Sequence, residues 1–432
     1  MWRPPSKILT GLVLLGLAWL TPCAADPDSE PAPEPTPLSL ATLEEQTLDR
    51  SGEVNPGDSP QIPSDLHANY TPFLGDTLWL KAGGYLQLEA SGDFGATGRQ
   101  FTLTPSQLGT EVGQDTSGFI PLGMDARLNF RRTRLHLDAY STFPEIRHGS
   151  RAYAEIDFSG KNGSVNLRHL FLSLPYVLIG RTNSAFKDPA AEPESIDSGG
   201  PNAKMGLRQQ GIRAVIPIGG DTLSLALEDP GPGISPDGSD LSDDGLKRKL
   251  DWAGHYRSNT DWGHLQFSAI RRDLSLINSL SATDPVNKFT GWGVGLSGQA
   301  FVDDKDNFQF EFSAGPGLGR YLNDLAGTRS ELGVTADGQV HPQFAWGGFV
   351  AYQHWLDEET RLNTYLSTTQ VNLLSGQAAD SFQRGYKVSL NVMRDVTENL
   401  RLGLEYEHGF RVSRDGFTAA GGRLEFMIRC GL

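Results

Sequence analysis

Cysteine is almost absent from the 432-residue sequence, which holds only Cys23 and Cys430. Cys23 falls in a segment that we expect to be removed on export, so Cys430 alone would remain and no internal disulfide could form. Cys430 lies in an alternating apolar frame with no second cysteine near it. This scarcity argues against a disulfide scaffold, a thiol nucleophile and a cysteine-based metal site.

Long apolar runs are missing after the first 25 residues. Hydrophobic residues make up only 38% of the chain. No later stretch approaches the roughly 20 apolar residues that a membrane-spanning helix needs. Amphipathic helices, expected of a soluble chain of this length, are nearly absent as well. The 50 glycines and repeated clusters of Asp, Asn and Pro instead divide the chain into short segments.

Catalytic and cofactor-binding motifs are missing too. The histidines His136, His148 and His169 lack metal-ligand spacing, and no GxSxG sequence is present. The run Gly315–Gly319 is rich in glycine, but no Lys-Ser/Thr pair follows it, so it is more typical of a loop than of a phosphate site. We therefore predict that the protein is not an enzyme and uses no cofactor or metal.

The first 25 residues have the layout of a secretory signal peptide. Arg3 and Lys7 precede the short apolar run 8–20, and small residues follow before Asp26. Residues 26–65 are rich in proline and acidic side chains, which predicts a periplasmic linker that cannot fold alone. Leucines at 38, 40, 43 and 48 leave open a short helix or a weak coiled coil there.

The formal net charge of −15 is unevenly distributed. Residues 26–65 carry ten acidic side chains against one basic, and 228–244 carry six more acids. The rest of the chain beyond residue 65 is close to balance. Net acidity argues against nucleic acid as a partner, but it does not identify the solute, because a lumen can be locally basic.

From about Thr77 onward, polar and apolar residues alternate with period two. In 134–140, 150–158, 308–314 and 400–407, apolar side chains occupy every second position and mostly polar ones fill the rest. Such segments are β-strands with one apolar and one polar face. The pattern suits either a soluble sandwich, whose apolar face is its core, or a membrane barrel, whose polar face lines a lumen.

Three features favour the barrel, which we place in residues 66–432. The segments number roughly sixteen, an even count suited to an outer-membrane barrel. Tryptophans lie near segment ends, as in two interfacial girdles. Tight turns such as 303–306 and 357–359 contrast with long polar loops at 93–124, 228–249 and 316–342. The predicted fold is therefore an all-β, transmembrane antiparallel β-barrel of about 16 strands.

The last residues carry a further pattern. Leu424, Phe426, Ile428, Cys430 and Leu432 occupy alternate positions up to the final residue. This frame resembles the C-terminal signal that the outer-membrane assembly machinery reads, with Leu432 in place of the usual terminal aromatic.

Several segments in a fixed order resemble the DcaP-like trimeric porins. They are 151–160 (RAYAEIDFSG), 167–169 (LRH), 179–189 (IGRTNSAFKDP), 196–202 (IDSGGPN), 207–213 (LRQQGIR), 402–409 (LGLEYEHG) and 423–426 (RLEF). The resemblance covers most of the chain from about Gly83, without 94–132 and 228–249. It implies a sixteen-stranded homotrimer that takes up small, often dicarboxylic, anions, with residues 182–206 folded inward as a constriction loop.

Basic side chains on the polar strand faces and in this loop are the candidate pore-lining residues. A guanidinium is always charged and its planar fork matches a carboxylate, so a series of arginines can guide an anion. Alternatively, they pair with Glu155, Asp157, Glu311, Glu405 and Glu425 and only hold the shape of the lumen. If the strand pairing is as expected, Arg134, Arg151 and Arg168 lie at similar depth. The candidates are Arg134, Arg151, Arg168, Arg181, Lys187, Lys204, Arg208, Arg213, Arg361 and Arg401.

The sequence thus predicts a porin for passive diffusion of small anions in a Gram-negative-type outer membrane. Its expected partners are the solute, outer-membrane lipid and lipopolysaccharide, and two further copies of the chain. Two other functions stay open: a non-conducting structural or adhesion barrel, and an outer-membrane hydrolase with a reactive triad at its rim.

Overall fold

The computed structural model describes residues 70–74, 77–97, 101–110, 125–142, 149–229, 249–277, 286–326, 328 and 330–432. The predicted signal peptide and linker lie outside these residues. Within them, no helix has both the length and the apolar character needed to cross a membrane.

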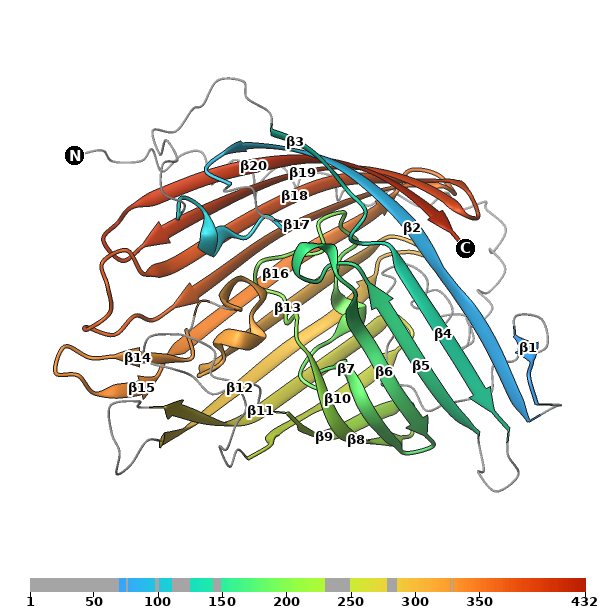
Figure 1. Ribbon diagram of the computed structural model, residues 1–432, viewed down its shortest axis with the longest axis horizontal. Helices are drawn as coiled ribbons and strands as arrows, with labels where there is room; N and C mark the ends of the chain where they lie inside the picture. The colour runs from blue at the N-terminus through green and yellow to red at the C-terminus, as the bar shows by residue number, and fades with distance from the viewer. Residues whose placement is uncertain are drawn as a thin grey trace, which may run out of the picture. The chain divides into compact units, whose positions relative to one another are not determined.

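Sixteen antiparallel strands form a closed barrel, because the first wall strand pairs with the last (Figure 1). Two consecutive segments, β3 and β4, share one wall position, since both pair with β2. Closure leaves no open sheet edge, which a barrel in lipid requires. The strands are β2 (Leu78–Gly95), β3 (Asp125–Asn129) with β4 (Arg134–Ser141), β5 (Ser150–Asp157), β6 (Asn166–Leu174), β7 (Val177–Asn183), β8 (Arg208–Ile218), β9 (Asp221–Glu228), β10 (Asp251–Thr260), β11 (Gly263–Ile277), β12 (Val286–Phe301), β13 (Asn307–Pro316), β16 (Phe344–Trp355), β17 (Thr360–Val371), β18 (Phe382–Thr397), β19 (Leu400–Ser413) and β20 (Thr418–Gly431).

Three short strands complete the sheet elements. They are β1 (Thr71–Pro72), which pairs with β2, and β14 (Leu332–Val334) and β15 (Val340–Pro342), which form a separate hairpin. The prediction of an all-β antiparallel barrel of about 16 strands is confirmed.

The alternation of the sequence sorts side chains to the two sides of the wall. On β19, Leu404 and Tyr406 are 46% and 42% exposed on the outside, whereas Glu405 and Glu407 between them are fully buried inside. The same division recurs on other strands, so the outside is a band of exposed apolar side chains. Cys430 belongs to this outer face and is exposed, in frame with Phe426 and Ile428.

The connections differ in length at the two ends of the barrel. At one end, strands are joined by short turns at 175–176, 219–220, 261–262, 302–306, 356–359 and 398–399. Long connections leave the other end, between β2 and β3, β9 and β10, and β13 and β16. In outer-membrane barrels the short turns are periplasmic and the long loops extracellular. We call the two ends the short-turn end and the long-loop end.

Several segments fold inward and pack against the inside of the wall. Phe186 and Met205, from the connection between β7 and β8, pack with Leu318 and Tyr321 from the β13–β16 connection and with Ile270 of the wall. Gly295 of β12 permits this close packing: a methyl group there would lie 2.5 Å from Ser268 Oγ and 3.3 Å from Met205 Cε. A side chain at that position would therefore push the inner segment away from the wall.

Candidate functional site in the barrel interior

Residues 184–206, which we call the inner loop, are tied to the wall by three acidic side chains, of which Asp188 and Asp197 are fully buried. Asp188 contacts Arg257, His264 and Ser297 on β10, β11 and β12. Glu194 and Asp197 contact basic side chains on β17, β18 and β19. These two groups of strands lie in different sectors of the barrel, so the inner loop crosses the lumen.

Basic neighbours keep the three loop carboxyl groups ionised. Burial alone would raise the pKa of each, but the net shift is downward. Arg257 and His264 lower the pKa of Asp188, Arg361 and Arg401 that of Glu194, and Lys387 with Arg132 that of Asp197. Each anchor is thus a buried ion pair, in which loss of one partner leaves an uncompensated charge.

Two further inward segments meet the inner loop at Asp324. Its Oδ1 accepts from the Ser106 amide at 2.7 Å, and its Oδ2 accepts from Asn202 Nδ2 at 3.0 Å. Asp324 N in turn donates to the Asn202 carbonyl at 2.9 Å. Burial raises the pKa of Asp324 to about 6, although the hydrogen bonds from Ser106 and Asn202 partly oppose it. This carboxyl joins the segments containing residues 106, 202 and 324 into one cluster.

Four of the predicted pore arginines contact carboxylates at 3.0 Å or less, and a fifth, Arg134, lies 3.9 Å from Glu155. Arg151 donates to both oxygens of Asp138, at 3.0 and 2.8 Å. Arg168 contacts Glu155 and Asp157 at 2.5 and 3.0 Å. Arg361 and Arg401 likewise share Glu194 and Asp395. All four side chains face the interior, and their pairing gives them a role in holding its shape.

Arg134 and Arg151 do not lie at similar depth, which corrects the expectation drawn from the sequence. Arg134 stands opposite Asp157, whereas Arg151 stands opposite Tyr140, six residues further along β4. At about 3.3 Å per residue the two positions are about 20 Å apart along the strand. Arg168, in the bulge beside Glu155, is at the level of Arg134. The sequence showed the face of each residue but not the register between strands.

The two predicted lysines belong to the inner loop itself. Lys187 and Lys204 both contact Glu192, at 2.7 and 3.3 Å, and Lys204 also donates to the Ser198 carbonyl at 3.1 Å. Lys187 is buried, and Lys204 is partly exposed with 13% of its side chain accessible. Lys204 is therefore the loop lysine that a solute could reach.

The remaining predicted arginines lie near the ends of the inner loop. Arg213 is buried and donates to the Asn183 carbonyl, and Arg208 donates through Nε to His169 at 3.2 Å. Arg181 is on the strand face of Ile179, opposite Leu170, and donates to the Leu167 carbonyl at 3.0 Å. This is the apolar outer face, so we leave Arg181 out of the interior site.

Two carboxylates expected to pair with arginines instead hold the inner loop by its backbone. Glu311 accepts from the Met205 amide at 2.7 Å. Glu405 accepts from the Ile196 amide and from the hydroxyls of Ser195 and Ser389. Glu405 thus lies under the same stretch of loop that Asp197 anchors. Wall residues therefore contact both the side chains and the main chain of the inner loop.

Several interior basic residues were missed at the level of sequence. Lys387 is fully buried between Asp197 and Glu407, at 2.8 and 2.9 Å. Arg423 contacts Asp93 at 2.6 Å. Lys387 alternates with Tyr386 and Val388, and Arg423 precedes Leu424 in the terminal frame, so alternation alone could have identified them. The others that we missed are Arg132, Arg257, Arg272, Arg411 and Arg429.

Arg429 belongs to a row of interior arginines on β19, β20 and β4, with β2 between the last two strands. It stands directly opposite Arg401, and its guanidinium lies 4.3 Å from the ring centre of Tyr85. The Arg134 guanidinium lies 5.7 Å from the same ring. In the described part of the chain, no carboxylate lies within 4 Å of Arg429, whose Nε donates to Gln87 at 2.8 Å. The row therefore presents positive charge that is only partly neutralised.

Comparison with solved structures identifies the architecture. The outer membrane channel DcaP of Acinetobacter baumannii superposes with a TM-score of 0.67 at 19% sequence identity, over 83% of this chain and 98% of that one. The fold is that of an outer-membrane porin. OmpT of Vibrio cholerae matches with a TM-score of 0.52 at 11% identity, over 84% of this chain and all of that one. An anion-selective porin from Comamonas acidovorans matches at 0.51 and 8% identity, over 82% and 100% of the two chains.

These neighbours agree with the fold that the sequence resemblance implied. No protein-family model and no curated protein matches the sequence. At these identities the likeness establishes the porin architecture alone. Function is inferred from the residues of the barrel interior. The described residues contain no group of three or more His, Cys, Asp or Glu side chains that could hold a metal ion.

Proposed function

We propose that this protein is an outer-membrane porin through which small solutes diffuse passively. The support is the closed barrel of 16 strands with an apolar outside and a charged inside. Barrels of this size enclose a lumen wide enough for an aqueous channel. The inner loop narrows that lumen and sets the size limit for solutes. The first 25 residues, with the layout of a signal peptide, support export. The alternating C-terminal frame supports insertion into the outer membrane.

We further propose that the pore favours small anions, among them dicarboxylates. The observation that carries this proposal is the direct pairing of Arg401 with Arg429 on β19 and β20. Like charges placed opposite each other on neighbouring strands destabilise a sheet. Glu194 and Asp395 neutralise Arg401, but Arg429 retains its charge beside Tyr85. Such an arrangement costs stability and supplies an attractive surface for a carboxylate.

The row of arginines also suits transport rather than tight binding. Arg401 and Arg429 face each other on β19 and β20, and Arg134 lies on β4, across Tyr85 of β2, so an anion can pass along one sector of the wall from guanidinium to guanidinium. Weak attraction shared among several sites lets a solute enter and leave. We also propose a homotrimer in the outer membrane, as the sequence resemblance implies.

A swelling assay with liposomes tests this function. Vesicles containing the purified protein should swell faster in an isotonic dicarboxylate such as succinate than in a neutral sugar of similar size. Equal rates would contradict anion preference, and no swelling with either solute would contradict the pore.

One observation favours a second function, a closed barrel with a structural or adhesive role. Three inward segments meet at Asp324, and the inner loop is anchored through Asp188, Glu194 and Asp197 by buried ion pairs. A barrel filled in this way could be rigid and non-conducting. The swelling assay distinguishes the two functions, because a closed barrel passes neither solute.

A further inference from the structure

The outer face of the wall carries a basic cluster at the long-loop end. Trp252 on β10, Arg271 on β11 and Trp292 on β12 lie side by side in one row of the sheet. Both indole rings are exposed on the outer face, at 61% and 50%. Tryptophans at this position mark the boundary between the apolar and polar parts of a membrane. Arg271 is therefore held at the level of the lipid headgroups.

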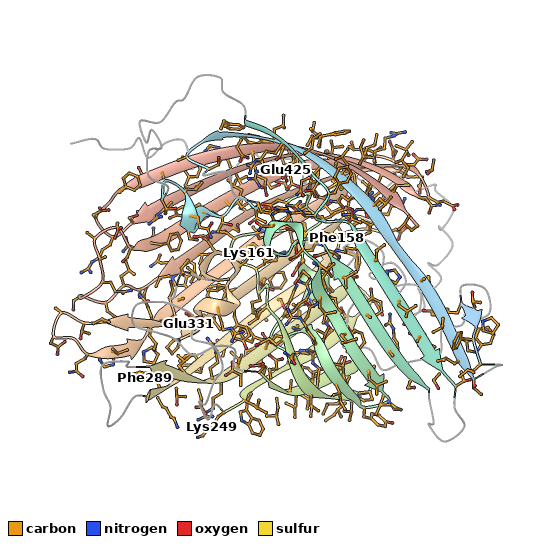
Figure 2. The ribbon with its side chains drawn as sticks, viewed as in Figure 1. Phe158, Lys161, Lys249, Phe289, Glu331 and Glu425 are labelled. Carbon is orange, nitrogen blue, oxygen red and sulfur yellow. The ribbon has the colours of Figure 1, made fainter. Side chains whose placement is uncertain are left out.

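Side chains along β12 follow the change from hydrocarbon to headgroup. From the middle of the wall outward the exposed positions are Leu296, Val294, Trp292, Thr290 and Lys288. The apolar part ends at the tryptophan, and a cation stands beyond it. In Figure 2 the labelled Lys249 and Phe289 lie toward the end of the barrel that carries β14 and β15, away from the C-terminus. This is the end of the long connections.

Two cations contact one carboxylate in this region, and a third lies on the neighbouring strand. Lys249 Nζ lies 3.8 Å and Arg271 3.5 Å from Asp273. Lys288 stands opposite Ser275, one step diagonally from Asp273 on the same face. The side chains of Lys249 and Arg271 are 75% and 53% exposed. Among the described residues, the cluster thus has three cations and one carboxylate, and its cations are accessible from the lipid side.

We propose that Lys249, Arg271 and Lys288 form a binding site for the phosphorylated glucosamine headgroup of lipopolysaccharide. The inference rests on the proposed outer-membrane placement, in which the long-loop end faces the outer leaflet. Phosphate oxygens pair with guanidinium and ammonium groups, and the acyl chains would lie along the apolar band below Trp252 and Trp292. The charge, the depth and the aromatic border all match an anionic lipid headgroup.

Native mass spectrometry of the full-length purified protein tests the site, with bis-phosphorylated lipid A as the probe. The double variant R271Q/K249Q should bind it about 25-fold more weakly, since each cation near an anionic lipid surface contributes about fivefold. D273N, which removes the carboxylate that Lys249 and Arg271 contact, should bind about fivefold more tightly. A gain in affinity is the opposite of what loss of a folded site would give.

The matched control is R394Q/K305Q, which removes two cations at the short-turn end. Arg394 is 56% exposed, close to the value for Arg271, and Lys305 lies in the 302–306 turn. Affinity for lipid A should be unchanged in this control, and wild-type protein should bind dephosphorylated lipid A or phosphatidylglycerol at least tenfold more weakly.

Three results would overturn the site: equal affinity of R271Q/K249Q and wild type, equal binding of phosphatidylglycerol and lipid A, or dissociation of an oligomer in R271Q/K249Q. The last would show that a second copy covers this face. Conductance of the same preparations is measured separately. If the protein conducts ions but does not bind lipid A, the proposed lipid site is contradicted and the proposed pore function is not.

Discussion

Glu194, at the middle of the inner loop, accepts a two-pronged hydrogen bond from Arg361 on β17, with nitrogen–oxygen distances of 2.6 and 2.7 Å. The same carboxylate accepts from Arg401 on β19 at 3.0 Å. One loop side chain therefore joins two wall strands and neutralises part of the arginine row. Its removal should change both the charge of the interior and the position of the loop.

We expect E194Q to increase the preference of the pore for anions. The substitution keeps the size of the side chain but removes the negative charge beside Arg361 and Arg401. The reversal potential in a KCl gradient across a planar bilayer measures the effect. E359Q, at an exposed position in the 356–359 turn, is the matched control and should leave selectivity unchanged. A shift toward cations in E194Q would contradict the proposed role of the arginine row.

R429Q should have the opposite effect and lower anion preference without unfolding the barrel. Arg429 contacts Gln87 and the ring of Tyr85, which are uncharged, so its replacement does not break a contact with a carboxylate. R168Q is the informative comparison, because Arg168 forms ion pairs with Glu155 and Asp157. Its replacement removes a positive charge from beside two buried carboxylates. We expect R168Q mainly to lower the unfolding temperature. Equal selectivity of R429Q and wild type would contradict the assignment of Arg429 to the conduction path.

K387M should destabilise the protein by about 3–5 kcal/mol, the usual cost of removing one partner from a buried ion pair. Lys387 is fully buried between Asp197 and Glu407, so Glu407 would lose its counter-charge and Asp197 would keep only that of Arg132. The temperature at which the folded barrel converts to the unfolded band on a denaturing gel reports the loss. R394M, at an exposed position on the same strand, serves as the control. An unchanged conversion temperature in K387M would show that the anchor contributes little.

The cluster around Asp324 should be more stable in mild acid than at neutral pH. Its pKa is raised by burial from 3.8 to about 6 in the folded state. The protonated form is therefore favoured by folding: the stabilisation is complete below about pH 4 and is lost as the pH rises through 6. The difference amounts to about 3 kcal/mol for a shift of this size.

Hydrogen exchange of the Ser106 and Asp324 amides checks this expectation, after correction for the intrinsic pH dependence of exchange. Protection should be greater at pH 5 than at pH 7.5 in wild type and independent of pH in D324N. Greater protection at pH 7.5 in the wild type would show that the ionised form of Asp324 is the one that holds the cluster.

Period-two alternation made most of the wall predictable, because a strand exposed to different surroundings on its two sides must alternate. It correctly placed Arg134, Arg361 and Glu405 on the inner face. Alternation carries no information on register, so the separation of Arg134 from Arg151 could not be foreseen. Arg181 was assigned to the interior from the motif at 179–189, although its alternation with the exposed Ile179 places it on the outer face.

The contacts of the inner loop could not be predicted from the sequence, for a different reason. Asp197 meets Lys387 across 190 residues and Ser106 meets Asp324 across 218, and nothing local in either segment specifies the partner. The sequence showed that the loop was too long for a turn and rich in charge. Which charges it would meet depends on the closure of the barrel around it.

Single-channel recording in a planar lipid bilayer tests the central claim most directly. The full-length purified protein should give stable conductance in three equal steps, with a reversal potential in a KCl gradient that favours chloride over potassium. Absence of conductance from folded protein would contradict the pore and support the closed barrel, and a preference for potassium would contradict the role assigned to Arg134, Arg401 and Arg429.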